Sequence, residues 1–169
     1  MNETIIYNWN NTVTLDDTIY CLGDFGFGPV NNLLPLFNRL NGKKILIRGN
    51  HDKKDVIKLP WDSIHDILEV KYQNITYNLC HYPDYHMRTC SKSSYDTRYL
   101  FGHCHGALTP HNCSCDVGMD CWGFTPVSIL QLDKLFENLP KNINETILET
   151  NTIWNAIQFM DKIDQNTII

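Results

Sequence analysis

Four short apolar segments of the chain each end in polar residues, most of them beside glycine. Interpreted as strands, these segments cover residues 18–22, 44–48, 75–80 and 99–101. The polar residues that follow them are, in chain order, Asp24, Asn50, His51, His81, His103 and His105. In layered α/β folds the loops at the carboxyl ends of neighbouring strands meet in one crevice. The pattern therefore predicts an α/β fold in which these side chains share a single site.

Hydrophobic periodicity completes the α/β pattern. Two further strands are predicted at residues 67–72 and 114–117. Apolar residues at helical spacing predict helices at residues 1–12, 31–40, 54–59 and 126–139. Pro35 is expected near the first turn of the second helix, where proline is tolerated. The length of 169 residues suits one domain, placed at residues 1–139, followed by a C-terminal helical tail at residues 140–169.

Charge and composition narrow the possible functions. The net charge of -5 and the pI near 5.7 do not support a nucleic-acid-binding module, which is usually basic, so nucleic acid is expected only as a substrate. No segment has the length and apolarity of a membrane span, and the first residues lack the pattern of a secretory signal. These features predict a cytoplasmic protein without a membrane partner. They predict nothing about its oligomeric state.

The seven cysteines allow two explanations. An odd number without a secretory signal favours reduced thiols in a reducing compartment. Cys113, Cys115 and Cys121 are close enough in the chain to suggest a zinc cluster, but no second pair completes four ligands. Buried thiols in strands are therefore the favoured explanation.

The residue types that follow the strands indicate which ligand they suit. Carboxylate, amide oxygen and imidazole form a mixed set that suits Mn²⁺, Fe or Zn²⁺ better than Ca²⁺. Alone, Gly23-Asp24 could be any turn, Gly49-Asn50-His51-Asp52 a helix cap, and His81 a histidine at a strand end. Packing explains Gly102-His103-Cys104-His105-Gly106 less easily, because it places two imidazoles in five residues. The order of all four motifs favours a metal site.

This series resembles the calcineurin-like metallophosphoesterase superfamily, whose pattern is D-x-H, G-D, G-N-H-D/E, H and G-H-x-H. The match runs from about Asp17 to Ser128. Its last part, DVGMDCWGFTPVS at residues 116–128, is similar to the closing signature of a small bacterial, phage and viral branch. The resemblance implies a four-layer αββα sandwich, with two mixed sheets packed face to face and helices outside them.

The resemblance also implies an activity and a role for each residue. The implied metal ligands are Asp24, Asn50, His81, His103 and His105. Asp24 would bridge two divalent ions, Mn, Fe or Zn, and His105 would bind the first of them. His51 would protonate the leaving oxygen, oriented by Asp52 or a neighbour. The implied reaction is hydrolysis of a phosphomonoester or phosphodiester, in a small molecule or a nucleotide, by a metal-activated hydroxide. Arg48 could contact phosphate, although a salt-bridged or solvated strand-end residue is the favoured interpretation.

One motif of the superfamily is missing. No D-x-H occurs before Asp24, so two ligands of the first ion and the strand that carries them are absent. Two hypotheses stay open. The preferred one is that a longer protein carries D-x-H upstream of Met1, because the other motifs are intact. The alternative is a degenerate, non-catalytic interaction domain on the same fold, with only Asp24 and His105 left in the first site.

Overall fold

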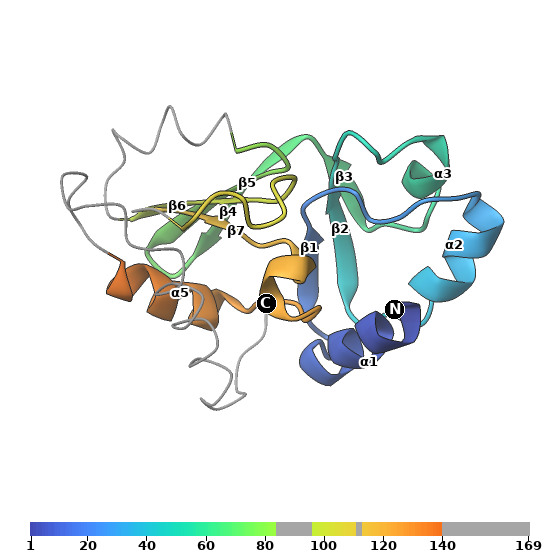
Figure 1. Cartoon of the computed structure of the whole chain (residues 1–169), viewed down its shortest axis with the longest axis horizontal. Coiled ribbons are helices and arrows are strands. Elements are labelled where there is room, and N and C mark those ends of the chain that lie inside the picture. Colours follow the sequence, from blue (N-terminus) through green and yellow to red (C-terminus); the bar gives the residue numbers. More distant parts are fainter. Residues whose placement is uncertain (84–95, 111–112, 140–169) are drawn as a thin grey trace.

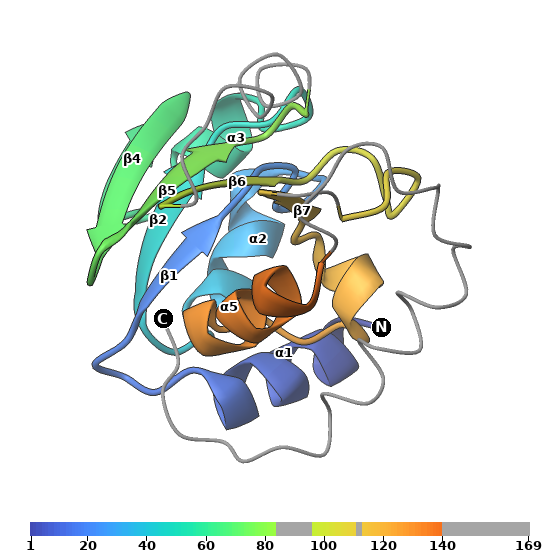
Figure 2. The ribbon, with the colours of Figure 1, turned by 90° about the vertical axis from the view of Figure 1, so that its left-hand side faces the viewer.

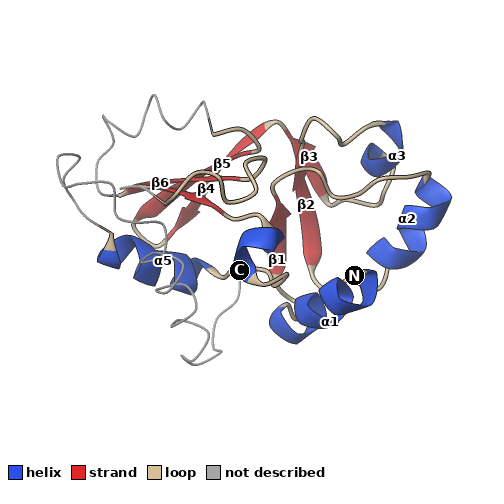
Figure 3. Cartoon of the chain, in the orientation of Figure 1, coloured by secondary structure: helices blue, strands red, loops and turns tan. Residues whose placement is uncertain are grey.

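A computed structural model describes residues 1–83, 96–110 and 113–139 of the chain. These residues form two β-sheets with helices around them (Figure 1; Figure 3). The expected α/β class is therefore confirmed. The predicted tail at residues 140–169, with its helical pattern, lies outside the described residues. In the part of the chain that is described, no helix is long and apolar enough to cross a membrane.

The first sheet, sheet A, is parallel. It contains β1 (Thr18–Cys21), β2 (Lys43–Ile47) and β3 (Ser63–His65) in the order β1-β2-β3. Parallel pairing in register, with Cys21 beside Leu46, brings the loops after β1 and β2 to the same edge of the sheet. The sequence pattern did not predict β3, because its three half-buried residues include one apolar side chain, Ile64, and show no apolar run.

The second sheet, sheet B, is mixed. It contains β4 (Ile67–Tyr72), β5 (Ile75–Cys80), β6 (Thr97–Phe101) and β7 (Ser114–Asp116) in chain order. The β4 and β5 strands form an antiparallel hairpin, whereas β5, β6 and β7 run parallel. The parallel pairing of Leu79 with Leu100 places His81 and Gly102 at the same edge. The predicted strands are all present, and β4 and β5 have the predicted bounds.

The helices are shorter than the sequence pattern suggested. The α-helices are α1 (Asn2–Thr12), α2 (Val30–Phe37), α3 (Lys54–Ile57) and α5 (Ile129–Asn138), and Met119–Trp122 forms the 3₁₀ helix η1. Helix α2 ends at Phe37 rather than at Leu40, and Pro35 lies inside it, beyond the first turn. Helix α5 begins after Ser128, because Pro126 and the cap residue precede its first turn.

Alternate side chains of the strands pack into different cores. Leu46 of β2 contacts the core under α2 and α3, whereas its neighbour Ile47 contacts the core of sheet B. In β1, Ile19 packs toward α1 while Tyr20 faces sheet B. Residues of both sheets therefore contribute to one core, which also takes the apolar face of α5.

A large apolar cavity lies beside β1. Among the described residues β1 pairs only with β2, so its other edge carries unpaired backbone groups. The cavity beside it measures about 800 Å³, and its lining includes residues of β1, α1, α5 and sheet B. Both helices lie below the strands in the two views (Figure 1; Figure 2). An open strand edge and an unfilled apolar space thus occur together.

The start of α5 provides a stability test. The Ser128 hydroxyl accepts from the Gln131 N–H, and the Gln131 side chain accepts from the Ser128 N–H, which forms a capping box. Ser128→Ala is expected to lower the free energy of unfolding by about 1 kcal/mol, because a buried helix N–H loses its partner. Ser128→Thr, which keeps the hydroxyl, should remain close to the native value. Urea unfolding measures both, and equal midpoints for the two variants would contradict the assignment.

Candidate metal centre

The loops after β1 and β2 approach each other closely because both contain glycine. A Cβ atom on Gly49 would collide with the Asp24 carboxylate, and one on Gly23 would collide with the His81 ring. Gly23 also has a φ of +90°, which favours glycine. Asp24 itself has a φ of 56°, an uncommon conformation for a residue with a side chain. The glycines therefore make room for the Asp24 carboxylate at the edge of sheet A.

A buried carboxylate holds these two loops together. Asp52 accepts hydrogen bonds from the backbone N–H groups of Asp24 (2.8 Å), Phe25 (3.0 Å) and Gly49 (2.8 Å). In addition, the N–H of His51 donates to the Asp24 carboxylate at 2.8 Å. The catalytic role expected of Asp52, orienting His51, stays a prediction. Its oxygens bind backbone N–H groups of both loops, so Asp52 positions the backbone that carries Asp24.

The orientation of the His81 ring is set by a backbone carbonyl. His81 is 1% exposed, and its Nδ1 lies 2.7 Å from the carbonyl oxygen of Leu22. Since a carbonyl oxygen only accepts, Nδ1 must carry a hydrogen. In the neutral ring Nε2 then presents a lone pair. This atom lies 3.0 Å from Asn50 Oδ1, 3.1 Å from His103 Nδ1 and 3.5 Å from Asp24 Oδ2.

Four predicted ligands thus direct electron-rich atoms at one point. Ligand atoms of Asp24, His81 and His103 all lie within 4.8 Å of one another, and Asn50 adds its amide oxygen. For comparison, ligand atoms about 2.1 Å from a tetrahedral ion are roughly 3.4 Å apart. Several acceptors facing a buried imidazole repel one another unless a proton or a cation lies between them. The donor set therefore fits a divalent cation that accepts both oxygen and nitrogen ligands.

The loop after β6 has a strained backbone at both of its histidines. His103 has a φ of 67° and His105 a φ of 49°. Left-handed conformations in residues with side chains cost free energy and persist where the surrounding structure holds them, often at functional sites. Asp116, at the end of β7, helps to hold this loop, because its carboxylate accepts from the N–H groups of Gly106 (3.1 Å) and Gly118 (2.9 Å).

His105 does not join Asp24, Asn50, His81 and His103, which we call the ligand cluster. Its Nδ1 lies 2.6 Å from the carboxylate of Asp120, and its side chain is 77% exposed. The hydrogen bond to Asp120 raises the pKa of the His105 imidazole above its usual value, and the charge of Asp24 adds to this shift. The predicted role of His105 as a ligand of a first ion stays a prediction. The sequence motifs indicated no role for Asp116 or Asp120, although both lie in the DVGMD segment at residues 116–120.

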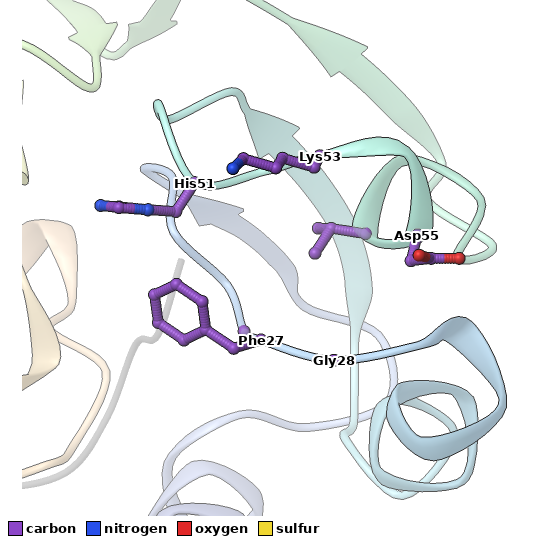
Figure 4. A pocket seen from close by; sticks show the side chains of 7 residues that line it. Phe27, Gly28, His51, Lys53 and Asp55 are labelled. Carbon is purple, nitrogen blue, oxygen red and sulfur yellow. The ribbon is translucent and has the colours of Figure 1, made fainter.

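His51 lies at the boundary between the ligand cluster and a second cavity. Its backbone contacts Asp24, whereas its exposed ring meets the ring of Phe27 edge to face, with centroids 5.2 Å apart. The cavity beyond it measures about 290 Å³ and is lined by Gly26, Phe27, Gly28, His51, Lys53, Asp55 and Val56 (Figure 4). Sequence analysis did not single out Phe27 or Lys53, because an exposed phenylalanine or lysine in a loop carries no motif.

The favoured interpretation of Arg48 agrees with the structure. Its guanidinium forms a two-pronged pair with Asp66, at 2.8 Å from Nε and 2.7 Å from Nη2. This hydrogen bond raises the pKa of Arg48, and the exposed pair lies at the end of β2. A strand-end salt bridge therefore explains Arg48 without a phosphate contact.

The cysteines correct one expectation and agree with another. Cys113, Cys115 and Cys121 are buried, and Cys115 lies in β7 as the expectation of buried strand thiols requires, whereas Cys121 lies in η1. Cys113 is disulfide-bonded, so the expectation of reduced thiols throughout is wrong. Burial first, and then Asp116 and Asp120, raise the pKa of the Cys121 thiol to about 12. A zinc thiolate cluster is not favoured by these surroundings.

Comparison with known proteins gives two similar chains. The chain is 30% identical over 146 residues to the uncharacterized protein MJ1445 of Methanocaldococcus jannaschii, covering 81% of this chain and 76% of that protein. Its fold is similar to the crystal structure of the protein of unknown function AQ665 from Aquifex aeolicus. The TM-score is 0.63 and the identity 26%, over 79% of this chain and 84% of that chain. No family model matches.

Proposed function

The chain belongs to the same family as the archaeal protein MJ1445, and we propose that it acts as a metal-dependent phosphoesterase of the calcineurin-like class. The observation that carries the proposal is the orientation of buried His81. Its Nε2 atom is turned toward Asn50, His103 and Asp24 by the carbonyl of Leu22. Metal-binding histidines commonly donate their other ring N–H to such a carbonyl.

The proposed ions are one or two divalent cations, Mn, Fe or Zn. The ligands of one ion are Asp24, Asn50, His81 and His103. Asp24 and His105 would supply part of a second site. A divalent cation lowers the pKa of a water molecule and neutralises phosphoryl charge, which suits hydrolysis near neutral pH.

Residues of the chain would contribute the remaining chemistry. His51 is exposed and its backbone N–H contacts Asp24, and its ring would donate a proton to the leaving oxygen of an ester bound at the ligand cluster. General-acid help of this kind is worth about 10²–10⁴-fold in rate. Asp52 would hold the loops that carry His51 and Asp24 in fixed positions, because it binds the backbone of both loops. The proposed substrates are phosphomonoesters or phosphodiesters of small molecules or nucleotides, with nucleic acid only as a substrate.

The finer fold proposal is a four-layer αββα sandwich that lacks its first strand in the residues described. Two features support it. The edge of β1 that faces away from β2 is open among the described residues, and the adjoining cavity of about 800 Å³ is lined by both sheets. A strand placed there would pair with β1 and fill apolar space. Its loop would reach the ligand cluster, because β1 ends there.

Hydrolysis assays with metal exchange test the function. Native chain treated with EDTA should lose turnover of p-nitrophenyl phosphate and of its bis ester, and Mn²⁺ should restore it. Asp24→Asn is expected to lower turnover at least about 100-fold, because a ligand oxygen is lost. The matched control Asp66→Asn alters an exposed carboxylate paired with Arg48 and should stay near native. Turnover that EDTA leaves unchanged would refute the proposal.

The second candidate function is a non-catalytic interaction domain on the same fold. It is favoured by one observation: His105 pairs with Asp120 and lies outside the ligand cluster, so among the described residues the proposed first ion keeps only part of its ligands. This function predicts weak cation retention and no turnover of either ester by the native chain. The same assays therefore separate the two candidates.

A further inference from the structure

A cavity of about 290 Å³ lies next to His51, the proposed proton donor. In the proposed reaction the phosphoryl group is bound at the ligand cluster, and His51 donates its proton to the leaving oxygen. The leaving group therefore extends from His51 away from Asp24. The walls of the cavity start at His51 itself and continue through Phe27 and Lys53 (Figure 4). The chemistry of these walls consequently indicates what the leaving group contains.

The first wall is an aromatic face. Phe27 is 75% exposed, although phenylalanine is among the residue types that are most often buried. Its ring lies at 61° to the His51 ring, so the two rings are not stacked face to face. The neighbouring Gly28 has a φ of +121° and nothing within 4 Å of the place where a Cβ would be. An aromatic ring of a ligand can therefore lie flat on Phe27 without a competing side chain.

The second wall is cationic. The ammonium group of Lys53 extends toward His51, on the same side as the Phe27 ring, whereas Asp55 lies at the far side (Figure 4). Among the residues that the structure describes, none forms an ion pair with Lys53, while Asp55 is paired with Lys58 at 3.5 Å. The cavity thus offers one positive charge for an anionic group, beside a surface for an aromatic ring.

We propose that this cavity binds a nucleotide, with its base stacked on Phe27 and its phosphate facing Lys53. This inference deepens the proposed function and rests on it: the nucleotide would be the leaving group of a phosphodiester. In that reaction water adds to phosphorus, the bond from phosphorus to the ribose oxygen breaks, and His51 protonates that oxygen. The products are a phosphomonoester and a nucleotide. For the dinucleotide pApA, one water molecule is consumed and two molecules of AMP form.

The size of the cavity limits the ligand to a single nucleotide. Pockets for drug-sized ligands usually measure roughly 300–1,000 Å³. A cavity of about 290 Å³ therefore suits a single nucleotide, not an extended strand of nucleic acid. The negative net charge of -5 also disfavours a long polyanion.

Equilibrium binding to the Mn²⁺-loaded full chain tests the pocket without turnover. AMP, adenosine and ribose 5-phosphate serve as probes in isothermal titration calorimetry. Native protein is expected to bind AMP about tenfold more tightly than ribose 5-phosphate, because base stacking on an aromatic side chain contributes this much or more. Phe27→Leu should reduce that ratio to about one, and Phe27→Tyr should keep it. The control Phe124→Leu changes another exposed aromatic residue outside this cavity and should leave the ratio unchanged.

Two substitutions of Lys53 test whether its charge contributes to AMP binding. Lys53→Gln is expected to weaken AMP about two- to fivefold, the usual range for an exposed ion pair, and to leave adenosine unchanged. Lys53→Arg should restore AMP binding. Equal native affinities for AMP and ribose 5-phosphate, or a ratio that Phe27→Leu does not alter, would overturn the pocket assignment. Phe27-dependent AMP binding by a chain that hydrolyses neither pApA nor bis(p-nitrophenyl) phosphate would instead leave the nucleotide pocket standing and refute the phosphoesterase. Hydrolysis of bis(p-nitrophenyl) phosphate but not of pApA would overturn the nucleotide as the leaving group.

Discussion

Replacing His81 with alanine is expected to abolish Mn²⁺ binding and ester hydrolysis together. The ring is buried, and its Nε2 atom is the point at which Asn50, His103 and Asp24 converge. Without it the remaining ligands have no common centre, so affinity for the cation should fall by at least about 100-fold. Metal content after gel filtration and turnover of bis(p-nitrophenyl) phosphate measure the two effects on the same sample.

Two companion variants separate ligand loss from misfolding and from lost acid catalysis. Asn50→Ala removes an exposed ligand oxygen, so the chain should fold normally while cation affinity falls. His51→Ala should keep the cation and lower turnover about 10²–10⁴-fold, because it removes the proposed proton donor. If His81→Ala and Asn50→Ala both retained the cation, the ligand assignment would be wrong.

Replacing Asp52 with alanine should cause the largest loss of stability among the polar residues of the site. The substitution leaves the N–H groups of Asp24, Phe25 and Gly49 without their acceptor in a mostly buried region. An unsatisfied buried donor costs about 1–3 kcal/mol, so a decrease of about 3 kcal/mol or more in the free energy of unfolding is expected. Urea unfolding of the metal-free chain measures it.

Asp62 provides the matched control for Asp52. Its carboxylate also accepts a backbone N–H, that of Lys44 at 2.8 Å, but it is exposed and has this one backbone donor. Asp62→Ala should therefore cost about 1 kcal/mol or less, because water replaces the lost acceptor. Similar losses for Asp52→Ala and Asp62→Ala would show that the link between the two loops contributes little. Retained Mn²⁺ affinity in Asp52→Ala would show that it does not position Asp24.

Local patterns in the sequence were enough to predict that four polar side chains lie close together. Asp24, Asn50, His81 and His103 each follow a strand whose apolar segment is short and regular, and parallel strands end at a shared edge. The same patterns located the strands other than β3, whose half-buried residues form no apolar run. The helix ends were predicted less accurately than the strands. The cap at Ser128 and the position of Pro35 within its helix both depend on where the first turn forms.

Partners that are distant in the chain could not be found in this way. The carbonyl of Leu22 orients His81 from 59 residues away, and no residue type marks a carbonyl for this role. The resemblance implied that Asp52 orients His51, and no local pattern showed that its carboxylate also accepts from the backbone N–H of Asp24. The resemblance implied His105 as an ion ligand, and no local pattern marked Asp120 as its partner.

The sequence by itself determined that this is an α/β chain with its polar residues gathered at strand ends, since strand period, glycine turns and residue type are local properties. The tertiary structure alone decided which atoms of those residues face one another. It also decided that Asp52 joins two loops, and that Phe27 and Lys53 form the walls of one cavity. The physical reason is that hydrogen bonds, desolvation and cavities depend on distances between side chains, and folding sets those distances.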